Sequence, residues 1–294
     1  MTTYDFQDGQ GPVAAHQHPN GGGWVAETAM AIPTSYVGPD ARVFGQAQVF
    51  GEARISGKAQ VSENAQIFGH ARISGSAKVS GEARISGKAQ VSGEALILGS
   101  AQVFGSAQVS GFARIIGSAQ VSGHAQVSGN TRIAGNAQVS GNTLMSESTW
   151  IFGNAQCTGN ARISGNAQIS GEARVSGYAE VNGSAQIAES SCLSEYAQVA
   201  ENAQISGHAQ ISGSSLISGE ARISGSARIS GKAQVSENAQ ISGEAQVSDY
   251  ALVAGNAQIS GETRVSGEAR ISGSDQYGTL YGWMDRPHHP SIPE

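Results

Sequence analysis

The sequence predicts an all-β fold, a parallel β-solenoid in which three six-residue repeats make one coil. Three observations indicate this fold. An aliphatic residue returns at every sixth position, a glycine usually follows it two positions later, and proline is absent from residues 41–274. Proline lacks the backbone donor that a sheet interior requires, so its absence indicates continuous hydrogen bonding along that stretch.

The six-residue frame starts at Val43 and continues without insertion to the hexad at Ile271, which makes 39 hexads. Position one is Val or Ile in 36 of them, and the exceptions are Met145, Cys157 and Leu193. Position five is nearly always Ala. Because positions five and one lie two residues apart, strand alternation points both inward and leaves position six outward.

Positions two to four must turn the chain at each corner. Position three is Gly in 32 hexads, and glycine suits a turn that needs a positive φ. In three of the seven hexads without this glycine, the next residue is Asn64, Asn202 or Asn238. Because Asn tolerates the left-handed region, we expect the turn to shift by one residue there.

The regular body covers residues 25–276, or 42 hexads, which corresponds to about 14 coils of eighteen residues. Its open ends would expose edge strands that invite pairing, so both ends need covers. We expect residues 1–24 to form an N-terminal cap and residues 277–294 a C-terminal aromatic cap. The expected capping side chains are Trp24, which covers the first coil, and Tyr277, Tyr281 and Trp283, which fall on inward positions of the frame.

The hexad, an aliphatic residue followed four positions later by a small one, resembles the hexapeptide-repeat left-handed β-helix superfamily over about 250 residues. The Gly-Gly-Trp-Val stretch at 22–25 is similar to the entry into the repeat of uncharacterised YdcK-type bacterial and phage proteins. The resemblance implies a single-stranded left-handed β-helix with triangular coils. Many such relatives are trimeric acyltransferases with a catalytic His near a subunit cleft and loops that hold the acyl donor. No loop interrupts the hexads of this chain from 41 to 274.

Composition excludes several functional classes. The 17 basic and 23 acidic residues are interspersed and give a net charge of −6, so the sequence predicts no nucleic-acid partner. No apolar run reaches membrane-spanning length, and the N-terminus lacks the features of a secretory signal. These features favour a cytoplasmic or phage-virion-associated protein with no membrane partner. The two cysteines form no disulfide framework, since Cys157 lies at an inward position and Cys192 at an outward one.

Few residues have the character of a chemical site. His16 and His18 form a His-x-His pair that is a weak metal-site candidate, because no third ligand is evident. His70, His124 and His208 all occupy position four, an outward corner, and we assign no catalytic role to them. We therefore expect no cofactor and no catalytic residue.

Large apolar residues at outward positions form the more informative pattern, because exposed aligned apolar side chains indicate a partner surface. Residues spaced by multiples of eighteen lie above one another along the solenoid, and three sets of large apolar residues are aligned in this way. The sets are Phe44, Leu98, Ile116 and Phe152 at position two, Phe50, Phe68 and Phe104 at position two of another stripe, and Leu144, Leu216 and Leu252 at position six, which we place on the face that bears Phe50.

The favoured hypothesis is a non-enzymatic structural or interaction rod that presents repetitive surfaces to a protein partner or to further copies in a homo-oligomer. One alternative is an acyltransferase-like enzyme with a site between subunits, using His16 or His18. Another is a phage or prophage virion accessory, such as a fibre or spike segment, since near-identical repeats expand easily by duplication.

Overall fold

The computed structural model describes residues 2–274, 276–278 and 283–284. The chain forms two compact units, Met1–Gly153 (unit 1) and Asn154–Glu294 (unit 2). The division between them falls inside the repeat body predicted for residues 25–276. Among the described residues, no helix has the length and apolar character needed to cross a bilayer.

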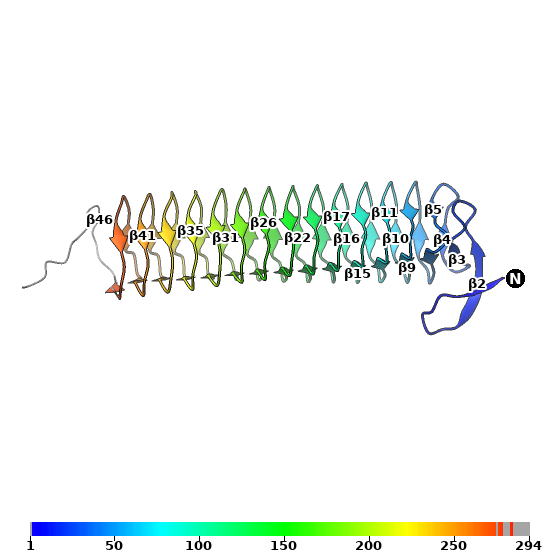
Figure 1. Ribbon diagram of the computed structural model, residues 1–294, viewed down its shortest axis with the longest axis horizontal. Coiled ribbons are helices and arrows are strands. Elements are labelled where there is room, and N and C mark those ends of the chain that lie inside the picture. The colour runs from blue at the N-terminus through cyan, green and yellow to red at the C-terminus, as the bar shows by residue number, and fades with distance from the viewer. Residues whose placement is uncertain (1, 275, 279–282, 285–294) are drawn as a thin grey trace, which may run out of the picture. The chain divides into compact units, whose positions relative to one another are not determined.

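Position six of each hexad and position one of the following hexad form one short strand. In unit 1 these strands begin every six residues from β6 (Arg42–Val43) to β24 (Trp150–Ile151), and in unit 2 from β25 (Gln156–Cys157) to β44 (Arg270–Ile271). Within each unit, a strand pairs in parallel with the strand eighteen residues further along, as Val43 does with Val61. Figure 1 shows these strands stacked coil upon coil within a unit. The predicted all-β parallel β-solenoid, with about 14 coils of eighteen residues, is confirmed.

Each coil contributes one strand to each of three parallel sheets. We name these sheets faces 1, 2 and 3 by their order in the eighteen-residue repeat. In unit 1 the first strands of the faces are β3 (Trp24–Ala26), β4 (Met30–Ala31) and β5 (Tyr36–Val37), and the second strands are β6, β7 (Gln48–Val49) and β8 (Arg54–Ile55). The turn after a face 1 strand is corner 1-2, and corners 2-3 and 3-1 follow in order. The same names apply by sequence position in unit 2.

The core is the column of inward side chains that the period of two predicts. Residues at positions one and five are almost fully buried, from Val43 and Ala47 to Val253 and Ala257. Where Thr or Ser replaces Ala at position five, its hydroxyl donates to a carbonyl three residues earlier, as Thr131 does to Ser128 at 2.7 Å. Inward polar groups are thereby satisfied within their own coil.

The prediction that the turn shifts by one residue at corners without glycine is wrong. The left-handed residue stays at position three in these corners as well. The φ angle is positive at each of the seven acidic residues that replace glycine, for example 56° at Glu63 and 60° at Glu195. Asn64 therefore does not take the left-handed conformation, and the turn does not shift by one residue. The replaced positions are Glu63, Glu147, Glu189, Glu195, Glu201, Glu237 and Asp249.

At five of these corners, the carboxylate stabilises the left-handed turn by accepting a hydrogen bond from a backbone N–H of the following coil. The N–H of Gly81 donates to Glu63 at 2.7 Å, and the N–H of Gly213 donates to Glu195 at 2.8 Å. Equivalent bonds join Glu189, Glu201 and Asp249 to the glycine eighteen residues later. A left-handed non-glycine residue costs of order 1–3 kcal/mol, and a hydrogen bond to a charged acceptor offsets about that amount.

An antiparallel hairpin covers the N-terminal end of face 1. β1 (Thr3–Asp5) pairs with β2 (Pro12–Gln17), and β2 pairs with the outer edge of β3 in the register His16↔Val25. Phe6, Ala15 and Ala26 form a small buried cluster beneath the hairpin. Trp24 takes an outward position in register with Arg42 and stacks on Tyr4, with ring centroids 4.5 Å apart. Trp24 thus packs on the outside of face 1 and not over the end of the core, and its role as a capping residue stays a prediction.

At the C-terminal end the chain leaves the hexad frame. β45 (Gln276–Tyr277) keeps the frame and pairs Tyr277 with Ile259. β46 (Trp283–Met284) pairs Trp283 with Arg264 and Met284 with Val265, so it is offset by one residue from the predicted register. Trp283 therefore stands at an outward register position, contrary to the prediction, because one extra residue precedes it. Tyr281 lies outside the described residues.

Candidate functional site

The His-x-His pair is divided between two environments. His16 is exposed on β2, and its Nδ1 lies 2.9 Å from the carboxylate of Glu27. His18 is buried, its Nδ1 accepts the N–H of Asn20 at 3.2 Å, and its Nε2 lies 3.1 Å from the carbonyl of Ile32. Both ring nitrogens of His18 are thus occupied in holding the loop before β3. The described residues contain no group of three His, Cys, Asp or Glu side chains that could hold a metal ion.

The three corner histidines are exposed at position four, as the frame predicts. The Nδ1 of His70 lies 3.3 Å from the carboxylate of Glu52, one coil earlier at corner 2-3. His124 occupies the same corner column three coils further along, and His208 stands at corner 1-2 of unit 2. No described hydrogen bond joins any of the three to a nucleophilic side chain.

The predicted apolar stripes fall on outward positions in both units. Phe68, Phe104, Leu144 and Phe152 expose between 36% and 40% of their surface. The remaining six predicted interface residues are partly buried: Phe44, Phe50, Leu98, Ile116, Leu216 and Leu252. Their role in binding stays a prediction, and the structure changes two of their placements.

Phe44 is not an open surface residue, because the N-terminal hairpin covers it. Its ring stacks on buried Phe6 with centroids 5.0 Å apart. The leucine stripe also lies on a different face from Phe50. Leu144 is part of β23 (Leu144–Met145) on face 3, whereas Phe50 follows β7 on face 2. The reason is that position six is the first residue of the strand on the next face, whereas position two of the same hexad follows the strand on the preceding face.

Corner 1-2 of unit 1 has a longer apolar strip than the sequence analysis identified. Four consecutive coils place Leu98, Ile116, Ala134 and Phe152 in one column, and we call this column the corner strip. On face 1 beside it, the outward side chains include Leu96 and Trp150, and Trp150 is 42% exposed. The eighteen-residue spacing also predicts these neighbours when alanine and all position-six residues are included.

Unit 2 has tyrosines that the sequence analysis also missed. Tyr178, Tyr196 and Tyr250 occupy position four of corner 2-3 and are 53%, 58% and 62% exposed. The rings of Tyr178 and Tyr196 stack with centroids 5.1 Å apart and an interplanar angle of 6°. Lys232 lies over the ring of Tyr250. The eighteen-residue spacing of tyrosine at position four is the sequence signal for this column.

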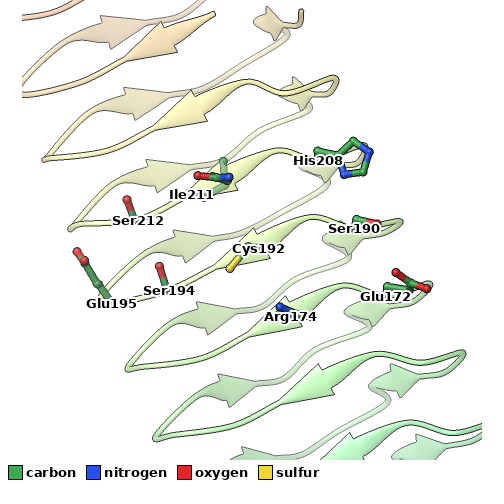
Figure 2. Close-up of a pocket in the computed structure, with 10 residues that line it drawn as sticks. Glu172, Arg174, Ser190, Cys192, Ser194, Glu195, His208, Ile211 and Ser212 are labelled. Atoms are coloured by element: carbon green, nitrogen blue, oxygen red, sulfur yellow. The ribbon is translucent and has the colours of Figure 1, made fainter. Parts of the chain in front are cut away.

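A hollow of about 640 Å³ surrounds Cys192 on face 2 of unit 2. Cys192 pairs in register with Arg174 and Gln210, and its shorter side chain leaves space between theirs. Figure 2 shows His208 and Glu172 at one corner, Glu195 at the other and Cys192 between them. No described hydrogen bond links the thiol to His208, so these groups form no nucleophile–base pair. The other cysteine, Cys157, is fully buried, and desolvation raises the pKa of its thiol.

A second hollow, of about 420 Å³, lies on face 3 of unit 1. Its floor is the position-six column of Tyr36, Arg54 and Arg72, which are in register on consecutive strands. Thr34, Glu52 and His70 stand at its side along corner 2-3. It is therefore a shallow cationic surface with one wall made by the Glu52–His70 pair.

A family model described as the YdcK β-solenoid repeat matches residues 65–81 and 167–183. One matched segment lies in each unit, and the two together cover a small part of the chain. No curated protein matches the chain.

Solved structures of UDP-N-acetylglucosamine acyltransferases are similar to the chain at low identity. The enzyme from Campylobacter jejuni is 17% identical with a TM-score of 0.38, and the match covers 54% of this chain and 67% of that one. The enzyme from Francisella novicida is 13% identical with a TM-score of 0.29, covering 66% and 64%. The enzyme from Moraxella catarrhalis is 15% identical with a TM-score of 0.26, covering 70% and 71%. At this level of likeness no activity follows for this chain.

Proposed function

We propose that this protein is a non-enzymatic interaction scaffold whose repetitive outer surface binds a second copy of the chain. The observation that supports the proposal is the corner strip of unit 1. Leu98, Ile116, Ala134 and Phe152 follow one another in four consecutive coils, with Leu96 and Trp150 beside them. Aligned apolar side chains at outward positions are typical of protein interfaces.

The spacing of the corner strip favours a second copy as its partner. Neighbouring strands lie about 4.8 Å apart, so the four side chains repeat at that interval over about 14 Å. A partner that fills the gaps between them must present apolar groups at the same interval. A second copy does so with the same strip, and two identical strips related by a twofold axis form a self-complementary contact.

The outward chemistry of the hexads is compatible with this role. Most position-two sites outside the strip are serine, which contributes little to an interface. The strip is therefore a local departure from the polar pattern at corner 1-2. Unit 2 has its own exposed aromatic column at corner 2-3, which is available for a different contact.

The test is the oligomeric state of the full chain and of two matched variants, measured by sedimentation velocity. Leu98→Ser, Ile116→Ser and Phe152→Ser together install the common position-two residue, and we expect them to convert an assembled species into a monomer. Phe68→Ser with Phe104→Ser changes corner 2-3 instead and should leave assembly unchanged. A wild-type chain that stays monomeric at every concentration would contradict the proposal, and so would equal dissociation of both variants.

A further inference from the structure

The hollow on face 3 of unit 1 has the composition of an anion-binding surface. Tyr36, Arg54 and Arg72 occupy position six of three consecutive coils, in the strands β5, β8 and β11 (Arg72–Ile73). The register pairs Tyr36 with Arg54 and Arg54 with Arg72. Two arginines opposite each other on neighbouring strands repel, so this pair is unfavourable unless negative charge lies between them.

No carboxylate of the described residues forms an ion pair with either of the two arginines, Arg54 and Arg72. The acidic side chain that lines the hollow, Glu52, lies 3.3 Å from the Nδ1 of His70 and is engaged there. The hollow therefore holds two guanidinium groups without a paired carboxylate.

Tyr36 orients one of these groups. The guanidinium carbon of Arg54 lies 4.9 Å from the centroid of the Tyr36 ring, which is the geometry of a cation–π contact. Such a contact uses the face of the guanidinium and leaves the N–H donors along its edge available. Those edge donors are the ones that bind phosphate oxygens in pairs.

We propose that this hollow binds a phosphate group, with Arg54 and Arg72 donating to its oxygens. Two guanidinium groups from consecutive coils match the double negative charge and the tetrahedral oxygens of a phosphate monoester or of free phosphate. The volume of about 420 Å³ leaves room for a small group attached to the phosphate. This inference does not depend on self-association through the corner strip.

The chain contains its own control. Arg114 and Arg132 form a second in-register pair on face 1 of unit 1, and Arg132 lies 4.7 Å from the ring centroid of Trp150. This pair has the same charge and also has an aromatic neighbour, Trp150 in place of Tyr36, but it stands beside the apolar corner strip and lines neither of the hollows described above. Binding that depends on the hollow must therefore distinguish the two pairs.

The experiment is a calorimetric titration of the full chain with inorganic phosphate and, separately, with glycerol 3-phosphate. Gln is the commonest position-six residue, so Arg54→Gln with Arg72→Gln and the control Arg114→Gln with Arg132→Gln should both keep the fold, which circular dichroism verifies. We expect the first variant to lose affinity by about ten-fold or more and the control to bind like the wild type. Tighter binding of glycerol 3-phosphate would identify a phosphate ester as the natural ligand class, and equal affinity would identify free phosphate.

Two results would overturn the proposal. One is a wild-type chain that binds neither compound. The other is an equal loss of affinity in both double variants, which would show a general response to surface charge. Either result can be told apart from a failure of the corner-strip proposal, because oligomeric state is not the readout.

Discussion

Unit 1 and unit 2 have nearly the same interior and very different outer surfaces. From Val43 to Ile271, inward position one is Val or Ile in both units, apart from Met145, Cys157 and Leu193. Outside, unit 1 has the corner strip and two arginine pairs, whereas unit 2 has an exposed tyrosine column. Acidic corners number two in unit 1 and five in unit 2. The comparison indicates that positions one, five and three of each hexad specify the coil. The outward positions can therefore differ between the two units without changing the fold.

Core substitutions should cause the largest loss of stability, and they test whether the interiors of the two units are equivalent. Ile97→Ala in unit 1 and Ile205→Ala in unit 2 each remove a fully buried side chain, so each should destabilise its own unit by about 2–5 kcal/mol. Hydrogen–deuterium exchange resolved by peptide would measure the loss in each unit. Gln204→Ala, which changes the exposed outward neighbour of Ile205, is the control and should change stability by no more than about 0.5 kcal/mol. A clear loss in one unit and none in the other would disprove the equivalence of the interiors.

Corner substitutions should cause a smaller loss of stability. They test how corners with glycine at position three differ from corners with Glu or Asp there. A Cβ added at Gly213 would lie 2.5 Å from the carbonyl oxygen of Gly231, and φ there is +70°. Gly213→Ala should therefore destabilise the protein by about 1–3 kcal/mol in chemical denaturation.

The control stands one coil earlier in the same column. Glu195→Gly relieves a left-handed φ but removes the acceptor for the N–H of Gly213, so the two effects should nearly cancel. Glu195→Ala keeps the strain and loses the bond, and it should cost about 1 kcal/mol. If Glu195→Ala were as stable as the wild type, the carboxylate would have no part in stabilising the corner.

The smallest effect on the fold is expected from chemical modification of Cys192. Treatment of the native protein with iodoacetamide at neutral pH should label this partly exposed thiol and spare Cys157. Burial raises the pKa of the Cys157 thiol, so it stays protonated, and no reagent reaches it without unfolding. Mass spectrometry after digestion gives the labelling of each site, and the melting temperature should not change. Labelling of Cys157 at the rate of Cys192 would show that the interior of unit 2 opens readily.

The sequence was sufficient to predict the solenoid and the inward or outward direction of its repeat side chains, because the hexad frame has no insertion from Val43 onward. It was not sufficient at three kinds of place. At Glu63 and its equivalents, the conformation depends on a hydrogen bond to a coil eighteen residues away, which no local propensity contains. At Phe44, burial depends on Phe6, a residue outside the repeat. At Trp283, one additional residue shifts the register, and the frame gives no sign of it.

The candidate surfaces were predicted in part. Aligned residues such as Leu98, Ile116 and Phe152 follow from arithmetic alone. The hollow at Arg54 and Arg72 was not predicted, because arginine is an ordinary residue at position six. Its interest arises from two arginines in consecutive coils, an aromatic neighbour and a missing carboxylate partner. Those features require knowledge of which side chains share a column and of how their charges are paired.

The constant register also has a consequence for how such a chain is made and how its length changes. Every described pairing between repeat strands of one unit joins residues eighteen apart, so the entropy lost in closing each of these coils is the same. Folding can therefore follow synthesis, with each emerging coil docking on the one already formed above the N-terminal hairpin. A gene duplication of eighteen codons would add a coil at no greater topological cost than its predecessors.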